Sequence, residues 1–457
     1  MDGPATSPAA PVRRGLSCAS NPHGFWWWLG GIAAVAFAIR VGVIVFVNPH
    51  VPELGDASAY HLLANHLADG RGYIRPLDLV RLHLVVPTAE YPPFHPFVLS
   101  LVARLGVRSV EGQRIALAFI GTGTVAMIGV VGRQIAGTKT GLVAAVLAAI
   151  SPMMFLPEAT LMSEAIFVFL VTVALFLAGR ARLSPSFVGF AALGAVLGLA
   201  VLTRAEAGLL TVFLVVPLAM RARSVAPNRR VFLAVTGFVI VGAVVIPWTA
   251  RNQSTFNVFV PVSNNLGTAL AGANCDLTYH GDSLGSWRST FGPGDTGAGQ
   301  CFTGFNGSQP HFNEARAANA ARKQGIDYLR DHADQLPTVM VARLGRTFGV
   351  FRPAQQIQLE ALEGRPESWE RAGTWLEWAL YPLAAAGLII LWRRRAPVGV
   401  LIAALVSVSV ATLITYGNQR FRIGAEPAIL VGAATALVTL ATRGSRADAV
   451  ANTTADP

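Results

Sequence analysis

The chain is poor in charge and in cysteine, and both shortages exclude classes of protein. Only 13% of its 457 residues are charged, 53% are hydrophobic and the mean hydropathy is +0.49, whereas a soluble domain has about 25% charged residues. Three cysteines are too few for a scaffold of several disulfides, and no Cys/His spacing matches a structural zinc site. The composition predicts an all-α polytopic membrane protein whose apolar stretches are helices that span lipid.

About ten transmembrane helices are expected. Each candidate is an apolar run ended by charge or proline, and Gly208–Met220 is the shortest. The ten runs are Trp26–Val47, Ile115–Ile135, Gly141–Leu156, Met162–Gly179, Phe187–Thr203, Gly208–Met220, Val231–Ala250, Trp375–Trp392, Gly399–Tyr416 and Ala428–Thr442.

These runs divide the chain into tails, membrane modules and two large exterior loops with juxtamembrane amphipathic helices. The predicted parts are a cytoplasmic tail 1–25, a module 26–250 that contains the first exterior loop 48–114, a second exterior loop 251–374, spans within 375–442 and a tail 443–457. The first helix is expected to stay uncleaved, because it contains Arg40 and has no small-residue cleavage site at its end.

Arginine and lysine set the predicted topology, since they gather in short cytoplasmic loops. The protein is expected in the plasma membrane with both termini in the cytoplasm. This orientation places on the cytoplasmic side the basic residues Arg13, Arg14, Arg133, Lys139, Arg180, Arg182, Arg221, Arg223, Arg229, Arg230, Arg393, Arg394, Arg395, Arg443 and Arg446. Leu336–Phe351 is predicted to be an interfacial helix, because a further span there would move Arg393–Arg395 outside. Much of the net charge of +11 belongs to these loops, so no nucleic-acid partner is expected.

The first exterior loop is predicted to contain a surface helix that follows Asp56 and ends at Gly70. Its apolar stripe is formed by Tyr60, Leu63, Ala64 and Leu67. The prolines of "EYPPFHP" are expected to hold 91–96 extended before a second short amphipathic segment. Surface positions are expected for the histidines of this loop, which are His61, His66, His83 and His95.

The second exterior loop combines an irregular lobe with a helix. Cys275 and Cys301 lie in the lobe, which predicts one disulfide in an oxidising compartment, while Cys18 lies in the cytoplasmic tail. The Ala-rich, periodic segment 311–336 predicts a helix that returns the chain to the membrane.

Charged residues at the exterior ends of the predicted spans point to a phosphate ligand. Short exterior loops should contain little arginine, yet Arg204, Arg420 and Arg422 lie in two of them, and Arg251 follows another span. The planar guanidinium donates two parallel hydrogen bonds to a phosphate, and a lipid phosphate lies at this depth. The carboxylates at the same side are Glu53, Asp56, Glu90, Glu158, Glu164, Glu206 and Glu426.

Carboxylates beside phosphate-binding arginines suggest group transfer. One carboxylate, for which Asp56 is the candidate, would take a proton from an attacking hydroxyl, while arginines stabilise charge on the departing phosphate. Glu53, Tyr60, Glu90, Tyr91 and Glu206 are further candidates for substrate contact. A divalent cation at the carboxylates is compatible with the sequence, which requires no cofactor.

Each assignment has a simpler alternative. Asp56 could serve only as a helix N-cap, and Glu53 as a solvated loop residue. Arg204 could form a structural ion pair with another helix, since Glu206 is too close in sequence to face it on one helix. Arg420 could extend to lipid headgroups; Arg422 and Arg251 have the same alternative.

Six short motifs, taken in order, resemble a known group of enzymes. They are "ELGDASAY", "EYPPFHP", "PEATLMSEAIF", "LTRAEAG", "PWTARNQ…PVSNNLG" and "YGNQRFRIGAEP". Over roughly 26–435 this order resembles polytopic GT-C glycosyltransferases of the protein O-mannosyltransferase and aminoarabinose transferase type, particularly actinobacterial members.

The resemblance implies transfer of a mannose- or pentose-like sugar, with inversion, from a polyprenyl-phosphate donor to an exterior glycan, lipid or protein. It implies that Asp56 is the first-loop catalytic acidic residue and that either Glu158 or Glu164 is a second one. It also implies that donor phosphate is bound by Arg204, Arg251 and Arg420, to which Arg422 is added as a neighbour. The chain departs from protein mannosyltransferases in lacking an adjacent Asp-Glu pair and a MIR-type insertion, and both departures weigh against a protein acceptor.

Two other function classes compete with this interpretation. A transporter or flippase of a lipid-linked sugar would also bind lipid phosphate, but transporters place charge near the midplane of repeated halves. A non-catalytic lipid-binding scaffold would be favoured if the Asp56 carboxylate lay far from the guanidiniums of Arg204 and Arg420.

Overall fold

The computed structural model describes residues 22–48, 50–52, 55–288, 301 and 312–453. Four residues discussed above, Arg13, Arg14, Cys18 and Glu53, lie outside these ranges. The described residues form helices joined by loops, and their only β pairing is an isolated bridge between Ile74 and Pro87. The all-α prediction is confirmed.

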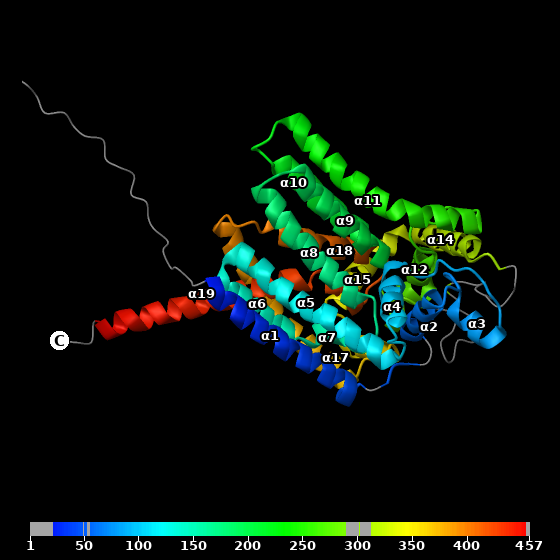
Figure 1. The fold of residues 1–457 in the computed structure, drawn as a ribbon, viewed down its shortest axis with the longest axis horizontal. Coiled ribbons are helices and arrows are strands. Elements are labelled where there is room, and N and C mark those ends of the chain that lie inside the picture. The colour runs from blue at the N-terminus through cyan, green and yellow to red at the C-terminus, as the bar shows by residue number, and fades with distance from the viewer. Residues whose placement is uncertain (1–21, 49, 53–54, 289–300, 302–311, 454–457) are drawn as a thin grey trace, which may run out of the picture.

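A bundle of long helices makes up the body of the molecule (Figure 1). Its members are α1 (Pro22–Gly42) with the π-helical continuation η1 (Val43–Val47), α5 (Val110–Ala136), α6 (Thr138–Ile150), α7 (Pro152–Ala159), α8 (Glu164–Leu183), α9 (Phe187–Thr203), α10 (Ala207–Arg221), α11 (Pro227–Phe256), α17 (Glu367–Arg393), α18 (Gly399–Ile414) and α19 (Glu426–Thr453).

Each of the ten predicted spans coincides with a bundle helix, or with the pair α6 and α7. Among the described residues, five helices are long and apolar enough to cross a membrane, and a sixth span results if α6 and α7, bent by 48° at Ser151, are counted together. The helices α9, α10 and α18 are apolar but shorter. The structure therefore confirms a multi-pass membrane protein, while the count of ten spans stays a prediction.

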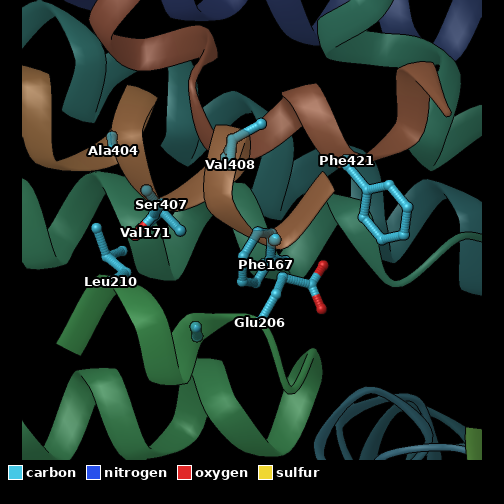
Figure 2. A pocket seen from close by; sticks show the side chains of 11 residues that line it. Phe167, Val171, Glu206, Leu210, Ala404, Ser407, Val408 and Phe421 are labelled. Carbon is cyan, nitrogen blue, oxygen red and sulfur yellow. The ribbon is translucent and has the colours of Figure 1, made fainter. Parts of the chain in front are cut away.

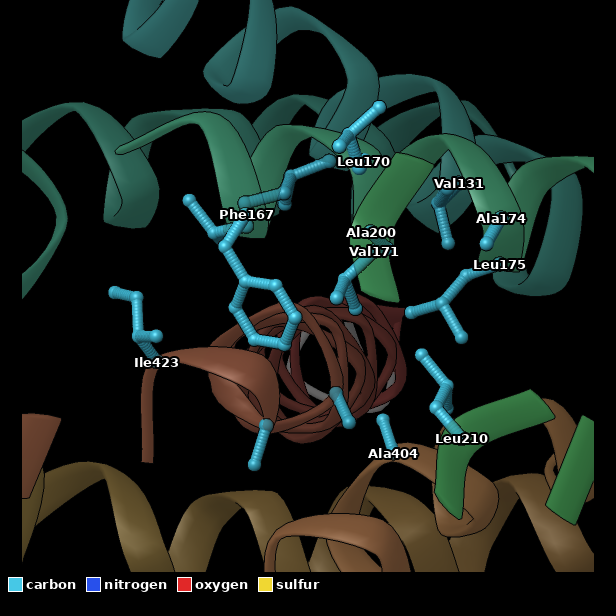
Figure 3. Close-up of a cluster of buried hydrophobic side chains, with 14 of the residues drawn as sticks. Val131, Phe167, Leu170, Val171, Ala174, Leu175, Ala200, Leu210, Ala404 and Ile423 are labelled. Carbon is cyan, nitrogen blue, oxygen red and sulfur yellow. The ribbon is translucent and has the colours of Figure 1, made fainter. Parts of the chain in front are cut away.

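Helix α19 runs through the centre of the bundle, where an all-apolar surface can be buried. Its residues Ala428, Leu430, Val431 and Ala433 have no solvent exposure. Figure 3 shows side chains of α5, α8, α9, α10 and α18 around a helix seen end-on. This packing fixes the start of α19, and with it the loop that precedes it.

Small residues allow neighbouring helices to approach closely. A Cβ atom on Gly387 of α17 would lie 1.8 Å from the carbonyl oxygen of Gly432 in α19, and one on Gly194 of α9 would lie 2.5 Å from that of Gly237 in α11. Close backbone contact of this kind drives helix association in membranes, where lipid weakens the hydrophobic effect.

The two large loops gather at one end of the bundle, away from the C-terminal end of α19 (Figure 1). The first contains α2 (Asp56–Ala68), α3 (Pro76–Leu82) and α4 (Phe94–Arg104). The second contains α12 (Asn265–Ala273), α13 (Asp276–Tyr279), η2 (Gly281–Ser283), α14 (Glu314–Asp331), η3 (Ala333–Gln335), α15 (Leu336–Thr347) and α16 (Pro353–Leu362). A further short 3-10 helix, η4 (Gln419–Gly424), joins α18 to α19.

Most of the predicted loop elements are present. The helices after Asp56 and after Phe312 are confirmed as α2 and α14. The extended conformation predicted for 91–96 is wrong in part, because α4 already begins at Phe94. Proline at the third position of a helix leaves no hydrogen bond unmade, so Pro96 is compatible with that start.

The helix predicted within Leu336–Phe351 is present as α15, but its arginine face is not solvated. Arg343 and Arg346 are both fully buried. Arg343 donates to the carbonyl oxygens of Ala273 and Leu413, and Arg346 donates to that of Leu284. The two side chains therefore attach α15 to the neighbouring lobe.

Cys275 and Cys301 form a disulfide, as predicted. Both residues are buried and pack with Ala271 and Ala321 in a small apolar cluster. The disulfide joins the lobe to the start of the segment that leads into α14.

Candidate active site

Asp56 is the first residue of α2, and its carboxylate faces other side chains. The residue before it, Gly55, is the N-cap, with φ of 119°, and no side chain caps the helix. Asp56 Oδ1 accepts a hydrogen bond from the Tyr91 hydroxyl at 3.1 Å, and Oδ2 accepts one from Arg420 Nη2 at 3.0 Å. The N-cap alternative for Asp56 is therefore wrong.

Glu164 forms ion pairs with Arg204 and Arg420, two of the arginines predicted to bind a lipid phosphate. It begins α8 and has no solvent exposure. Its Oε1 atom lies 2.9 Å from Arg204 Nη1 and 2.5 Å from Arg420 Nε. One buried carboxylate thus holds both guanidiniums, which keep 13% and 14% side-chain exposure.

Arg204 also pairs with Glu206, which corrects the sequence argument against that contact. Arg204 Nε lies 2.5 Å from Glu206 Oε1. Arg204 follows the last residue of α9 in an extended conformation, with φ of −150° and ψ of 122°. The helical spacing rule does not apply there, because the two residues lie in a turn between helices.

Glu363 is a site residue that the sequence did not reveal. It lies in the turn between α16 and α17, and one carboxylate oxygen is 3.6 Å from Arg420 Nη1. Burial raises the pKa of this carboxyl to about 7, and the nearby Asp56 adds to the rise while Arg420 opposes it. Nothing in the local motif "LEGRPE" distinguishes Glu363 from a solvated loop residue.

Asp56, Glu164, Arg204, Arg420 and Glu363 are called the arginine–carboxylate cluster below. Burial would favour a neutral Arg420, but Glu164, Asp56 and Glu363 together raise its pKa well above its ordinary value. The cluster therefore keeps a permanent cation next to a partly exposed carboxylate, Asp56, whose side-chain exposure is 30%.

Glu158 lies apart from the cluster. Its carboxylate is 3.0 Å from Arg40 Nε, and both side chains are buried between α1, α5 and α7. Gly121 of α5 makes room for this pair, because a Cβ there would lie 1.6 Å from Glu158 Oε1. Of the two acidic residues that the sequence could not separate, the structure places only Glu164 with Asp56.

Arg251 also lies apart from the cluster, and its contacts are with the backbone. Its guanidinium donates to the carbonyl oxygens of Tyr73 and Thr88, at 2.9 Å and 2.6 Å. Glu314 of α14 accepts hydrogen bonds from Thr88 at 3.0 Å and from Arg75 at 3.2 Å. These contacts hold the segment 73–91 in place. Arg251, which lies in α11, therefore supports the backbone of the first loop.

Arg422 is buried and already paired. It has 1% side-chain exposure, lies 2.7 Å from Glu426, and donates to the Tyr381 hydroxyl at 2.9 Å. The alternative in which Arg422 extends to lipid headgroups is therefore wrong.

A cluster of aromatic rings lies next to Asp56 and packs against α2. Tyr60 packs edge-on against Tyr91 and His95, with ring centroids 4.8 Å and 4.6 Å apart, and its hydroxyl donates to Ser163 at 3.4 Å. Burial lowers the pKa of His95 to about 4. Surface positions were predicted for the loop histidines, which is wrong for His95 and His66, because both are buried.

Glu90 is solvent-exposed and lies beside Tyr91. The neighbouring Tyr91 is the residue of this segment that contacts Asp56.

An apolar groove leads to Arg204 from between α8, α10 and α18 (Figure 2). Its enclosed free volume is small, about 10 Å³. Figure 2 shows Glu206, Phe167 and Phe421 close together at one part of its lining. The Arg204 guanidinium lies 5.8 Å and 5.5 Å from the centroids of the Phe167 and Phe421 rings. The groove is lined by Phe167, Val171, Glu206, Ala207, Leu210, Ala404, Ser407, Val408, Ala411, Phe421 and Gly424.

Within the described ranges, no three His, Cys, Asp or Glu side chains are arranged to hold a metal ion. The structure therefore assigns no residues to the divalent cation considered from the sequence.

The comparisons with known proteins agree with this architecture. Residues 90–248 match the family model of dolichyl-phosphate-mannose-protein mannosyltransferases. The chain resembles the GT-C glycosyltransferases. The matched region contains Tyr91, Glu164 and Arg204 but ends before Arg420. No curated protein matches the chain.

Several solved structures are similar in fold. The archaeal oligosaccharyltransferase AglB from Archaeoglobus fulgidus, in complex with an inhibitory peptide and a dolichol-phosphate, is 15% identical with a TM-score of 0.51, covering 94% of this chain and 52% of that one. The apo form of the oligosaccharyltransferase from Archaeoglobus fulgidus is 14% identical with a TM-score of 0.51, covering 95% and 52%. ArnT from Cupriavidus metallidurans, bound to undecaprenyl phosphate, is 15% identical with a TM-score of 0.43, covering 93% and 80%.

The likeness to the oligosaccharyltransferase shows a shared fold at 15% identity. The chain spans about half the length of that protein. The activity of this chain must therefore be argued from its own site.

Proposed function

We propose that the protein is an integral membrane glycosyltransferase that moves a mannose- or pentose-like sugar from a polyprenyl-phosphate donor to an exterior acceptor, with inversion. The observation that carries this proposal is the contact of Arg420 with both Asp56 and Glu164. It brings a partly exposed carboxylate next to two guanidiniums, which is what a base and a phosphate leaving group require.

The reaction follows from the positions of these groups. Asp56 takes the proton of an acceptor hydroxyl, whose oxygen attacks the anomeric carbon on the face opposite the phosphate. The bond between the anomeric carbon and the phosphate oxygen breaks, and its electron pair leaves with the phosphate. Arg204 and Arg420 stabilise the charge that grows there, and Glu164 positions both guanidiniums.

We assign the prenyl chain of the donor to the groove between α8, α10 and α18, whose walls must move apart to admit it. Its lining is apolar except for Glu206 and Ser407, and it approaches Arg204. A lipid in it would bring its phosphate to the arginines while its tail stays among apolar side chains. The dolichol-phosphate named with the archaeal oligosaccharyltransferase, which shares the fold, supports a donor of this class.

The orientation of the protein is also part of the proposal. Arginine and lysine in the short loops favour cytoplasmic termini in the plasma membrane and an exterior site. The gathering of both large loops at the end of the bundle away from the C-terminal end of α19 agrees with this arrangement (Figure 1). The acceptor would be a cell-envelope glycan, a lipid or a protein.

The test measures sugar release or transfer from a panel of radiolabelled polyprenyl-phosphate sugars in membranes that contain the full chain. Asp56→Asn should reduce turnover by at least about a hundredfold, because an amide cannot accept the proton. Asp69→Asn is the matched control, since Asp69 follows the same helix and pairs with Arg108 on the surface. Turnover by neither wild type nor control would overturn the proposal, and full activity of Asp56→Asn would remove Asp56 as the base.

One observation favours a second candidate, a transporter or flippase of a lipid-linked sugar. Arg40 of α1 pairs with Glu158 near the end of α7, the second helix of the bent pair α6 and α7. Intramembrane charges on broken helices are typical of transporters. Movement of a fluorescent polyprenyl-phosphate sugar across proteoliposomes, abolished by Arg40→Met together with Glu158→Leu but retained in Asp56→Asn, would favour this candidate.

A further inference from the structure

All three nitrogens of the Arg420 guanidinium face carboxylates. Nε lies 2.5 Å from Glu164, Nη2 lies 3.0 Å from Asp56, and Nη1 lies 3.6 Å from Glu363. A phosphate binds arginine through a pair of neighbouring N–H groups. A phosphate that approaches through Nη1 and Nη2 therefore meets Glu363 beside Nη1 and Asp56 on Nη2.

The three carboxylates differ in how firmly they are held. Glu164 has no exposure and also binds Arg204, and Asp56 accepts a second hydrogen bond from Tyr91. Glu363 has the longest contact with Arg420 and the greatest exposure of the three, 35%. An ion pair that is long and partly exposed contributes little free energy, so Glu363 is the carboxylate that can leave.

The position of Glu363 in the chain also permits movement. It lies between α16 and α17, next to Gly364, whose φ is 88°. The carbonyl oxygen of Gly364 accepts a hydrogen bond from Asn48 at 3.0 Å, which ties the turn to the first loop. The backbone of the turn is thus fixed while the Glu363 side chain projects to Arg420 and solvent.

We infer that Glu363 occupies the place of the donor phosphate on Arg420 and must give way before the donor binds. The inference rests on the proposed function, because it assumes that Arg420 receives a lipid phosphate. It makes Glu363 a specificity residue. An anionic headgroup replaces the charge contact that Arg420 loses with Glu363, whereas a neutral or cationic lipid does not replace it and binds more weakly.

The charges around Glu363 make the competition dependent on pH. The groups that face it are Asp56 of α2, Glu164 of α8, Glu360 of α16 and Arg420 of η4. Burial and the three carboxylates raise the pKa of Glu363 to about 7, against the effect of Arg420. Below that pH Glu363 is neutral and no longer competes, so donor affinity rises as the pH falls through 7.

The experiment measures binding of undecaprenyl phosphate to the full chain in detergent at pH 6 and pH 8, by calorimetric titration. At pH 8 Glu363 is mostly charged in the wild type and competes for Arg420, so Glu363→Gln should bind several-fold more tightly than wild type. At pH 6 the two affinities should agree within about twofold. The second ionisation of the phosphate probe affects all variants alike and cancels in these ratios.

Matched variants separate competition from structural damage. Glu367→Gln removes a carboxylate four residues later, which is exposed and 3.9 Å from Arg371, and should behave as wild type. Glu363→Ala should reproduce the tighter binding of Glu363→Gln, and both should melt within a few degrees of wild type.

Equal or weaker binding by Glu363→Gln at pH 8 would overturn the competition while the donor site stands. Absence of binding by every variant, including wild type, would overturn the competition together with the proposed function.

Discussion

Glu164 and Arg420 form an ion pair of 2.5 Å although 256 residues separate them in sequence. The same carboxylate oxygen faces Arg204, which lies between α9 and α10. A carboxylate with no solvent exposure, placed against two cations, fixes the distance between the guanidiniums before any ligand arrives. The pair therefore positions Arg420 of η4 and Arg204 against the start of α8.

Replacement of Glu164 by Gln should reduce both stability and donor affinity. It removes the buried charge that holds Arg204 and Arg420 together, and breaking such a contact costs about 3 kcal/mol or more. We expect a lower melting temperature in detergent and at least a tenfold rise in the donor KM. Glu111→Gln, which changes an exposed carboxylate in the first turn of α5, should leave both quantities unchanged. Wild-type melting and kinetics in Glu164→Gln would contradict this role.

Replacement of Glu314 by Gln should loosen the segment 73–91. Glu314 accepts hydrogen bonds from Thr88, Asn264 and Arg75, and the amide would turn one acceptor into a donor that faces other donors. Hydrogen bonds to a charged group contribute about 2 to 3 kcal/mol, so amide hydrogen exchange in this segment should accelerate.

The same variant should lower kcat, because the segment ends at Tyr91, which binds Asp56. Asp327→Asn on the same helix α14 is the control, since Asp327 pairs with Lys323 at the surface. Unchanged exchange in 73–91 together with lower activity would mean that Glu314 acts in another way.

The predicted topology was enough to predict that Asp56, Arg204 and Arg420 lie in one site, because it places all three at the same side of the membrane, at the ends of predicted spans. It could not separate Glu158 from Glu164. The helix α7 ends at Ala159, and Leu161 then takes a left-handed conformation with φ of 57°, so the two carboxylates on either side of this turn face different neighbours.

The remaining errors concern contacts that leave no pattern in the sequence. Arg251 binds main-chain carbonyl oxygens of the first loop, which any residue could supply. Glu363 reaches Arg420 only because the turn before α17 packs against residues near Gly55 in the first loop. Tertiary contacts between two separate loops decided both positions, and local propensity carries no information about them.

Reduction of the disulfide between Cys275 and Cys301 should destabilise the part of the second large loop that contains it. The bond closes a segment of 26 residues, for which the loss of chain entropy predicts about 3 kcal/mol. We expect a reducing agent, or the double variant Cys275→Ser and Cys301→Ser, to lower the melting temperature. Cys18→Ser should melt as wild type and keep its sensitivity to reduction. Equal melting with and without reductant, with the bond shown to be broken by mass spectrometry, would contradict the prediction.

Acid should destabilise the first loop through His95. Burial lowers the pKa of this imidazole to about 4 from a value of 6.5. The unfolded chain therefore binds the proton first, so the stabilisation is complete above pH 6.5 and is lost as the pH falls toward 4. Between pH 7 and pH 5 the loss should be about 2 kcal/mol.

His95→Phe should remove this part of the pH dependence, because phenylalanine keeps a ring against Tyr60 and does not titrate. The measurement is thermal denaturation in detergent at both pH values. His280→Phe, at an exposed position, should retain the wild-type decline. If His95→Phe declines as steeply as wild type, other groups cause the acid sensitivity; a flatter profile would show that the imidazole beneath α2 is neutral in the folded protein.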